Sequence, residues 1–259
     1  MPFTFSHPGF VIPIYNKWSP YFSLTGLFFG SIIPDFEYFV CRIIEAKYTH
    51  FGHGIFSINI PAAFVMTFVF HYLIRNSLIY ALPKPLTQMY VHHVEFEWFR
   101  YFKTNVMKVI LSIILGVLTH IFLDALTHDT SILIKYIPGL GIKFSDVGAH
   151  PPGVYTVVQY VLSIIGLWIF IKYLLSISKK NPAISYSVWV SIFYWLIFIS
   201  VTAYITFLKM QVVENVKEFT NVLTMVLAGL VGASIIAGIT TSIIYIIFKT
   251  LKPQTKTQN

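Results

Sequence analysis

The sequence predicts an all-α polytopic membrane protein, a single integral membrane domain (1–259) built as a helical bundle with five transmembrane helices. Two observations predict this class. Hydrophobic residues make up 56% of the 259 residues and charged residues only 11%, whereas a soluble domain has about 25% charged residues. In addition, five apolar segments are long enough to cross roughly 30 Å of hydrocarbon as helices. The N-terminal MPFTFSHPGF has no basic region and no small-residue cleavage site, so we do not expect a signal peptide.

The expected spans follow one another from residue 54 onward. They cover residues 54–74, 106–127, 154–175, 184–208 and 221–248. A sixth candidate, 18–34, is short, is interrupted by Gly26 and Gly30 and ends at Pro34. This segment fits either a sixth span or a buried helix that other helices cover. We expect a core at 1–178, with additional helices and a polar tail at 179–259.

The stretch between the first two long spans has a different composition. Residues 76–105 are polar and aromatic, and we expect their second half to lie along the membrane surface. His71, which precedes them in an otherwise apolar segment, is expected to be a packed histidine or one at headgroup depth.

Basic residues set the expected orientation of the five spans. Lys and Arg are more numerous on the side that carries the C-terminus, and cytoplasmic loops are the ones enriched in them. We therefore expect a multi-pass protein of the bacterial cytoplasmic (inner) membrane, with the C-terminus inside and residues 1–50 outside. The net charge of +8 does not indicate nucleic acid, because the cations lie at the ends of apolar segments; the expected partner is the lipid bilayer. The sequence does not fix an oligomeric state.

Ionisable residues in apolar segments are the strongest functional signal. In GVLTHIFLDALTH, residues 116–128, a histidine, an aspartate and a second histidine recur every four positions on one helix face: His120, Asp124 and His128. Such groups are costly inside a membrane and by default indicate function. The pattern alone leaves three alternatives, namely half of a metal site, a proton relay or a polar cluster that joins helices.

Three further stretches carry histidines or carboxylates, and with five spans they meet on the same outer face. Histidine nitrogens and carboxylate oxygens suit zinc and other first-row divalent metals, including manganese. The candidate metal ligands are His7, Asp35, His50, His53, His120, Asp124 and His128. The candidate catalytic residues are Asp35 and Glu37, because a free carboxylate can act as general base towards metal-bound water. A set of this size suits one catalytic metal with surrounding partners, or more than one metal.

Four motifs follow one another in a specific order: MPFTFSHPGFVIPI, LTGLFFGSIIPDFEYF, FGHGIFSINIP and LGVLTHIFLDALTH. Together they resemble the bacterial membrane family called domain of unknown function 4184, and the likeness extends to VVQYVLSIIG at residues 157–166. The order of a His, a Pro-Asp, a His pair and HxxxDxxT is also similar to predicted membrane-bound metal-dependent hydrolases. These in turn are weakly similar to zinc-dependent phospholipase C.

The resemblance implies a ligand set and an activity. The residues that it places at or near metal are His7, Asp35, His53, His120 and Asp124, with Asp35 as a bridging ligand or base. It favours His53 over His50, because His53 follows Gly52 at the start of a helix. It implies a metal-dependent hydrolase, specifically a phosphoesterase acting on a phospholipid-like substrate at the outer membrane surface. Two alternatives remain: a metal or proton transporter, and a non-enzymatic structural membrane protein.

Overall fold

The computed structural model describes residues 4–37, 48–50, 52–129, 131–145, 151–177, 188–211 and 235–247. These residues are largely helical and include no strand beyond an isolated β-bridge between Lys143 and Gly153. Four helices are long and apolar enough to cross a membrane: Ile55–Ala81, Val106–Ala125, Val154–Ser176 and Ser191–Leu208. The predicted class, an all-α helical membrane protein, is confirmed at this level.

The described residues do not confirm the predicted five spans. Four predicted spans correspond to the four long helices, whereas 221–248 lies largely outside the described residues, with the shorter apolar helix Ile235–Ile247 as its described part. The undecided segment 18–34 contains the short apolar helix Leu24–Asp35. Most side chains of that helix are buried against its neighbours, so it is a covered helix too short for a span.

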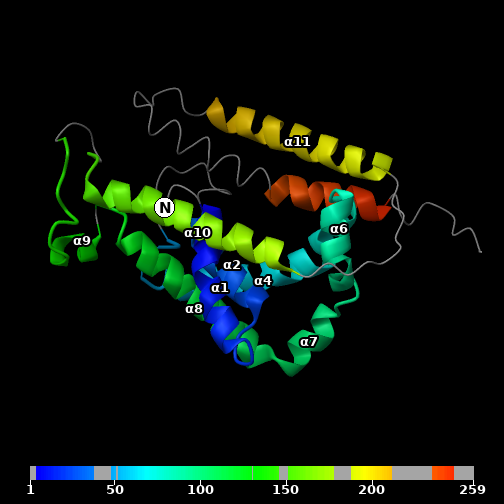
Figure 1. The fold of residues 1–259 in the computed structure, drawn as a ribbon, viewed down its shortest axis with the longest axis horizontal. Helices are drawn as coiled ribbons and strands as arrows, with labels where there is room; N and C mark the ends of the chain where they lie inside the picture. Colours follow the sequence, from blue (N-terminus) through cyan, green and yellow to red (C-terminus); the bar gives the residue numbers. More distant parts are fainter. Residues whose placement is uncertain are drawn as a thin grey trace, which may run out of the picture.

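The central helices pack around that covered helix, with α9 at one end of the molecule and α6 and α7 at the other (Figure 1). The elements are η1 (Thr4–Ser6), α1 (His7–Trp18), α2 (Leu24–Ile32), η2 (Ile33–Asp35), η3 (Ile55–Asn59), α4 (Ile60–Val69), η4 (Phe70–Ile74), α5 (Arg75–Ala81), α6 (Lys84–Tyr90), η5 (Val91–His93), α7 (Trp98–Thr104), α8 (Val106–Ala125), α9 (Ile132–Tyr136), α10 (Val154–Ser176) and α11 (Val188–Met210).

Glycines allow α2 and α8 to pack backbone against backbone. A Cβ atom added to Gly30 would overlap the carbonyl oxygen of Ile113, and one added to Gly116 would lie 2.5 Å from the carbonyl oxygen of Leu27. Small residues permit such close approach between membrane helices. The interruption that made 18–34 a doubtful span is therefore what lets this helix pack against α8.

Local signals fix both ends of α2. The helix begins after Ser23, whose hydroxyl accepts a hydrogen bond from the Gly26 N–H and whose own N–H donates to Ser112 Oγ of α8 at 2.7 Å. The chain then tightens into η2, which contains Pro34 and ends at Asp35. The close contact with α8 brings this carboxylate next to the C-terminal turns of α8.

The apolar core lies between α2, α4 and α8. Its buried residues are Phe29, Ile32, Ile33, Ala63, Met66, Trp98, Val109, Ile113 and Val117. By contrast, α10 and α11 expose large apolar side chains such as Ile164 and Phe193. A helix surface of this kind suits lipid contact, because hydrocarbon does not penalise exposed apolar groups.

The helix Ile55–Ala81 contains two π-helical turns, η3 and η4. Such turns occur frequently at functional sites. η3 ends at the buried Asn59, and η4 contains the buried His71. Each of these side chains belongs to one of two polar clusters, which lie near opposite ends of this helix.

Candidate metal centre

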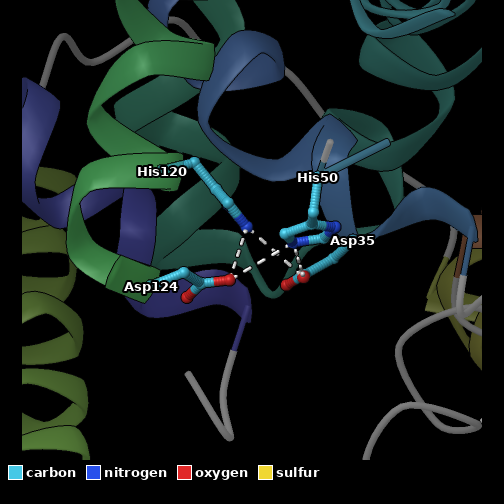
Figure 2. A group of neighbouring side chains, drawn as sticks. All are labelled: Asp35, His50, His120 and Asp124. Carbon is cyan, nitrogen blue, oxygen red and sulfur yellow. Dashed lines mark ion pairs between the residues drawn. The ribbon is translucent and has the colours of Figure 1, made fainter. Parts of the chain in front are cut away.

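Two histidines and two aspartates from three parts of the chain lie close together (Figure 2). They meet where α2, α8 and the start of the helix Ile55–Ala81 converge. One possible ligand atom from each lies within 4.8 Å of all the others. The four residues are Asp35, His50, His120 and Asp124. All four are among the predicted metal ligands, and a cluster that can bind a metal ion is therefore present.

The distances between the histidine nitrogens and the carboxylate oxygens are close to those between metal ligands. His120 Nε2 lies 3.4 Å from Asp35 Oδ1 and 3.3 Å from Asp124 Oδ2. His50 Nε2 lies 3.7 Å from Asp35 Oδ1 and 3.2 Å from Asp124 Oδ2. Tetrahedral coordination with bonds of about 2.0–2.2 Å separates neighbouring ligand atoms by about 3.3–3.6 Å. Three of the four distances exceed the usual hydrogen-bond range of about 2.7–3.2 Å.

His120 has the orientation of a metal ligand. Its Nδ1 lies 2.7 Å from the backbone carbonyl oxygen of Ser31, to which it donates, so in the neutral ring, the form that binds metal, the lone pair is on Nε2. Nε2 is buried and forms no hydrogen bond of acceptable geometry within the described residues. Metal-bound histidines commonly donate their second ring N–H to a carbonyl or carboxylate in this way.

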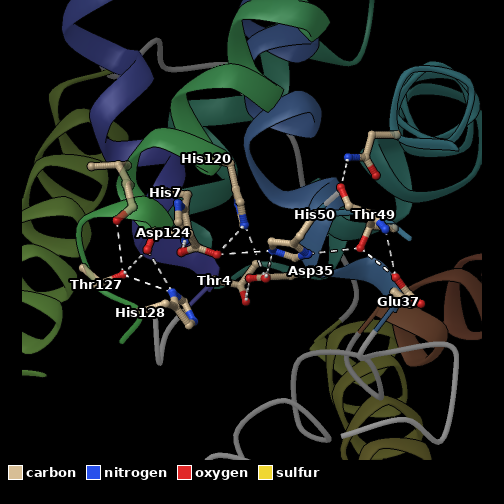
Figure 3. A network of polar contacts seen from close by, with 12 residues as sticks. Thr4, His7, Asp35, Glu37, Thr49, His50, His120, Asp124, Thr127 and His128 are labelled. Carbon is tan, nitrogen blue, oxygen red and sulfur yellow. Dashed lines mark hydrogen bonds and ion pairs between the residues drawn. The ribbon is translucent and has the colours of Figure 1, made fainter. Parts of the chain in front are cut away.

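Glu37 and Thr49 orient His50 from the side opposite to the cluster (Figure 3). Glu37 Oε2 accepts hydrogen bonds from the N–H of Tyr48 at 3.1 Å, from the N–H of Thr49 at 3.0 Å and from the Thr49 hydroxyl at 2.9 Å. Thr49 Oγ1 also lies 3.2 Å from His50 Nδ1. Because the hydroxyl proton goes to Glu37, the oxygen accepts from Nδ1–H, and Nε2 faces the cluster. Asn59 Nδ2 donates to the Thr49 carbonyl at 2.7 Å and anchors the same segment.

The structure therefore places Glu37, a predicted catalytic residue, outside the group of four. Asp35, the other predicted catalytic residue, lies in it. Thr4 Oγ1 donates to Asp35 Oδ2 at 2.5 Å, which leaves Oδ1 directed at the two histidines. Burial alone would raise the pKa of Asp35, but His120 in its protonated form, without a metal, outweighs burial and holds this pKa below its usual value. Asp35 is thus an ionised carboxylate.

His7 lies against the group without entering it. Its ring stacks on that of His120, with centroids 3.9 Å apart and planes at 18°. Its Nε2 is 3.7 Å from Asp124 Oδ1, the oxygen that faces away from the other histidines. Both ring nitrogens of His7 are buried without a hydrogen-bond partner in the described part of the chain. Burial lowers the pKa of His7 well below its usual value, so the ring is neutral.

The two remaining predicted ligands lie further out. His128 Nδ1 is 3.0 Å from the backbone carbonyl oxygen of Asp124, at the edge of the cluster. His53 is exposed and is not part of the group. The resemblance favoured His53 over His50, whereas the geometry favours His50.

The exposure of the cluster is uneven. The side chains of His7 and His120 are fully buried, whereas those of Asp35, Asp124 and His50 are 8%, 10% and 14% exposed. A water molecule or a substrate oxygen would therefore reach His50 and the two carboxylates before His120.

Sequence reasoning missed the residues that support the ligands. Thr4, Ser31, Thr49 and Asn59 each form a hydrogen bond that fixes a ligand or the segment that carries it. Thr4 and Thr49 stand three positions and one position before a candidate histidine, which is the only sequence signal for them.

Comparison with known proteins identifies the family. The family model described as domain of unknown function (DUF4184) matches residues 1–245, and the chain belongs to this family. No curated protein and no solved structure matches the chain. The match includes every residue of the cluster, whereas no relative supports the resemblance to metal-dependent hydrolases or phospholipase C.

Proposed function

We propose that this DUF4184 protein is a metal-dependent hydrolase that cleaves phosphoesters at the membrane surface. The observation that carries the proposal is the donor set. Two imidazole nitrogens and two carboxylate oxygens lie at ligand-like separations, and His120 Nε2 has no hydrogen-bond partner within the described residues. Such a set suits zinc, with manganese as the second candidate.

Asp35, His50, His120 and Asp124 would hold the ion. A divalent metal bound there would lower the pKa of a water molecule and polarise a phosphoryl oxygen, once these join or displace one of the four ligands. The residues of the chain supply the remaining requirements. Asp35, oriented by Thr4, and Asp124 offer the oxygens that can accept a proton from the attacking water. The partly exposed edge at His50 admits the substrate.

The position of the cluster favours a lipid substrate. His120 and Asp124 lie in the last turns of a helix long enough to span the membrane, and His50 lies shortly before the start of another. The ends of such helices lie near headgroup depth, where lipids carry their phosphodiesters. A phospholipid-like substrate therefore needs no path into the hydrocarbon to reach the cluster.

Metal content tests the first step of this proposal. Elemental mass spectrometry on protein purified without chelator should find about one equivalent of zinc or manganese per chain. The His120→Ala and Asp35→Ala variants should contain none. The wild type, but neither variant, should then hydrolyse a phospholipid or a generic phosphodiester.

Two other results would overturn the proposal. No metal in the wild type, even after incubation with zinc or manganese, would make the cluster a polar lock between helices. Bound metal with no hydrolysis, together with metal flux in proteoliposomes, would favour the transporter alternative.

A further inference from the structure

A second polar cluster lies towards the end of the helix Ile55–Ala81 that is opposite to the candidate metal centre. It borders an open cavity of about 570 Å³ between this helix and the segment 94–103. The lining includes His71, Arg75, Trp98, Arg100 and Lys103. The cavity thus combines a buried cation, two further cations and aromatic rings.

Arg75 is the unusual member of this lining. It is 8% exposed, and no carboxylate among the described residues forms an ion pair with it. Its hydrogen bonds go to neutral groups, namely the Asn76 amide oxygen, His71 Nδ1 and the carbonyl oxygens of Val94 and Phe96. These occupy four of the five guanidinium N–H donors. The donors are largely satisfied, but the buried charge has no anion, and an unpaired buried charge is costly.

The partners of Arg75 cannot supply that negative charge. His71 must accept at Nδ1, because arginine only donates, so its Nε2–H donates to Thr25 Oγ1 at 3.1 Å and the ring is neutral. His71 stacks on Trp98 with centroids 4.2 Å apart and planes at 11°. The buried indole Nε1 of Trp98 has no hydrogen-bond acceptor in the described part of the chain.

The charges of the lining, taken together, favour an anion. Arg100 and Lys103 add two cations from α7, while Glu95 and Glu97 add two carboxylates. All four of these side chains are exposed, so water and salt screen them strongly, and their charges sum to zero. The charge of Arg75 is buried and is screened much less. The field inside the cavity is therefore positive.

We propose that this cavity binds a phosphate group, with Arg75, Arg100 and Lys103 as its cationic partners. Guanidinium groups bind phosphate oxygens with short, charge-assisted hydrogen bonds. Tyr72, Phe96 and Phe99 border the cavity and are exposed, so an acyl chain has an apolar surface beside the phosphate. Basic pockets of this kind bind anionic lipid headgroups on the cytoplasmic side of membranes, the side on which the distribution of Lys and Arg predicts this cavity to lie. The site is independent of the metal proposal.

Ligand-dependent thermal stabilisation of the detergent-purified full chain tests this site, because a ligand that binds only the folded state raises Tm with its concentration. The probes are dihexanoyl phosphatidylglycerol, dihexanoyl phosphatidylcholine and inorganic phosphate. We expect phosphatidylglycerol to give a saturable rise in Tm. The Arg100→Gln/Lys103→Gln variant, which alters only exposed side chains, should raise the apparent Kd at least tenfold. The matched control Lys172→Gln, an exposed cation at the end of α10, should leave it unchanged.

The three probes also distinguish the sources of the phosphate. Saturable stabilisation by inorganic phosphate that the double variant weakens would support the site with a free ion as ligand. A response to phosphatidylglycerol alone would support it with a lipid as ligand. Equal responses to both lipids that the double variant leaves unchanged would overturn the proposal, and so would no saturable response to any probe.

Discussion

Two fully or nearly buried histidines, His120 and His71, show how differently one residue type can be used in this molecule. His120 donates from Nδ1 to a carbonyl and turns Nε2, which has no hydrogen bond among the described residues, towards two aspartates. His71 uses both nitrogens, one with Arg75 and one with Thr25. The first cluster has carboxylates beside imidazoles, whereas the second has a guanidinium without a carboxylate partner in the part of the chain that the structure describes. A buried histidine is thus a candidate ligand only when a ring nitrogen is left over and faces other donors.

The largest expected effect is on metal content, which should differ between the His120→Ala and His71→Ala variants. His120→Ala should reduce metal from about one equivalent per chain to none, because it removes the buried nitrogen that faces both carboxylates. His71→Ala should keep the metal and instead lower the free energy of unfolding by about 1–3 kcal/mol, because Arg75 and Thr25 lose their partner. Elemental analysis and thermal unfolding of both variants measure this. Loss of metal in His71→Ala with a folded protein would contradict the distinction.

Replacement of Arg75 tests how much the second cluster contributes to the free energy of unfolding. Arg75→Met preserves much of the side-chain length but leaves the carbonyl oxygens of Val94 and Phe96 without their donor. We expect a loss of about 2–4 kcal/mol in the free energy of unfolding, because hydrogen bonds to a charged group are among the stronger ones. Chemical unfolding of the purified protein measures it, with Arg100→Met as the exposed control. A loss below 0.5 kcal/mol, on the order of a surface substitution, would show that Arg75 does not join the helix to the segment 94–98.

Removal of the hydrogen bonds that orient His50 should have a smaller effect on metal binding than removal of His120. Thr49→Val removes the hydroxyl that links Glu37 to His50 and should weaken metal affinity by about 10–100-fold, as loss of such indirect partners commonly does. Thr49→Ser should restore it. Thr67→Val is the control, because that buried hydroxyl donates to the Phe64 carbonyl within α4. Competition with a chelator of known affinity measures all three, and equal affinities throughout would assign Glu37 and Thr49 a purely structural role.

The sequence predicted those features that depend on local pattern. Apolar length marked the four long helices, and the spacing of His120 and Asp124 placed both on one face of α8. Both aspartates of the cluster were recognised in the same way, because an ionisable group beside an apolar segment stands out by its cost.

Features that depend on distant contacts could not be predicted. Glu37, a predicted catalytic carboxylate, accepts the N–H groups of residues 48 and 49, a contact that no spacing rule gives. Likewise the pairing of Arg75 with the carbonyls of residues 94 and 96 depends on how the chain returns to the helix. Residues 18–34 remained ambiguous for a similar reason, since only the partner glycine at 116 shows that this helix is covered.

The smallest expected effect is that of His53→Ala, which tests whether His50 or His53 is the metal ligand that precedes the helix Ile55–Ala81. Gly52 has a positive φ of 53°, which turns the chain between them and leaves His53 in solvent. The anchors at Glu37 and Asn59 hold Thr49, so the residue that follows it, His50, is the one directed at Asp124. His53→Ala should therefore leave metal content and affinity unchanged, whereas His50→Ala should weaken affinity by more than the Thr49 variant. The opposite result would restore the preference for His53 that the family resemblance implied, and would require the segment 48–53 to adopt a different conformation when metal binds.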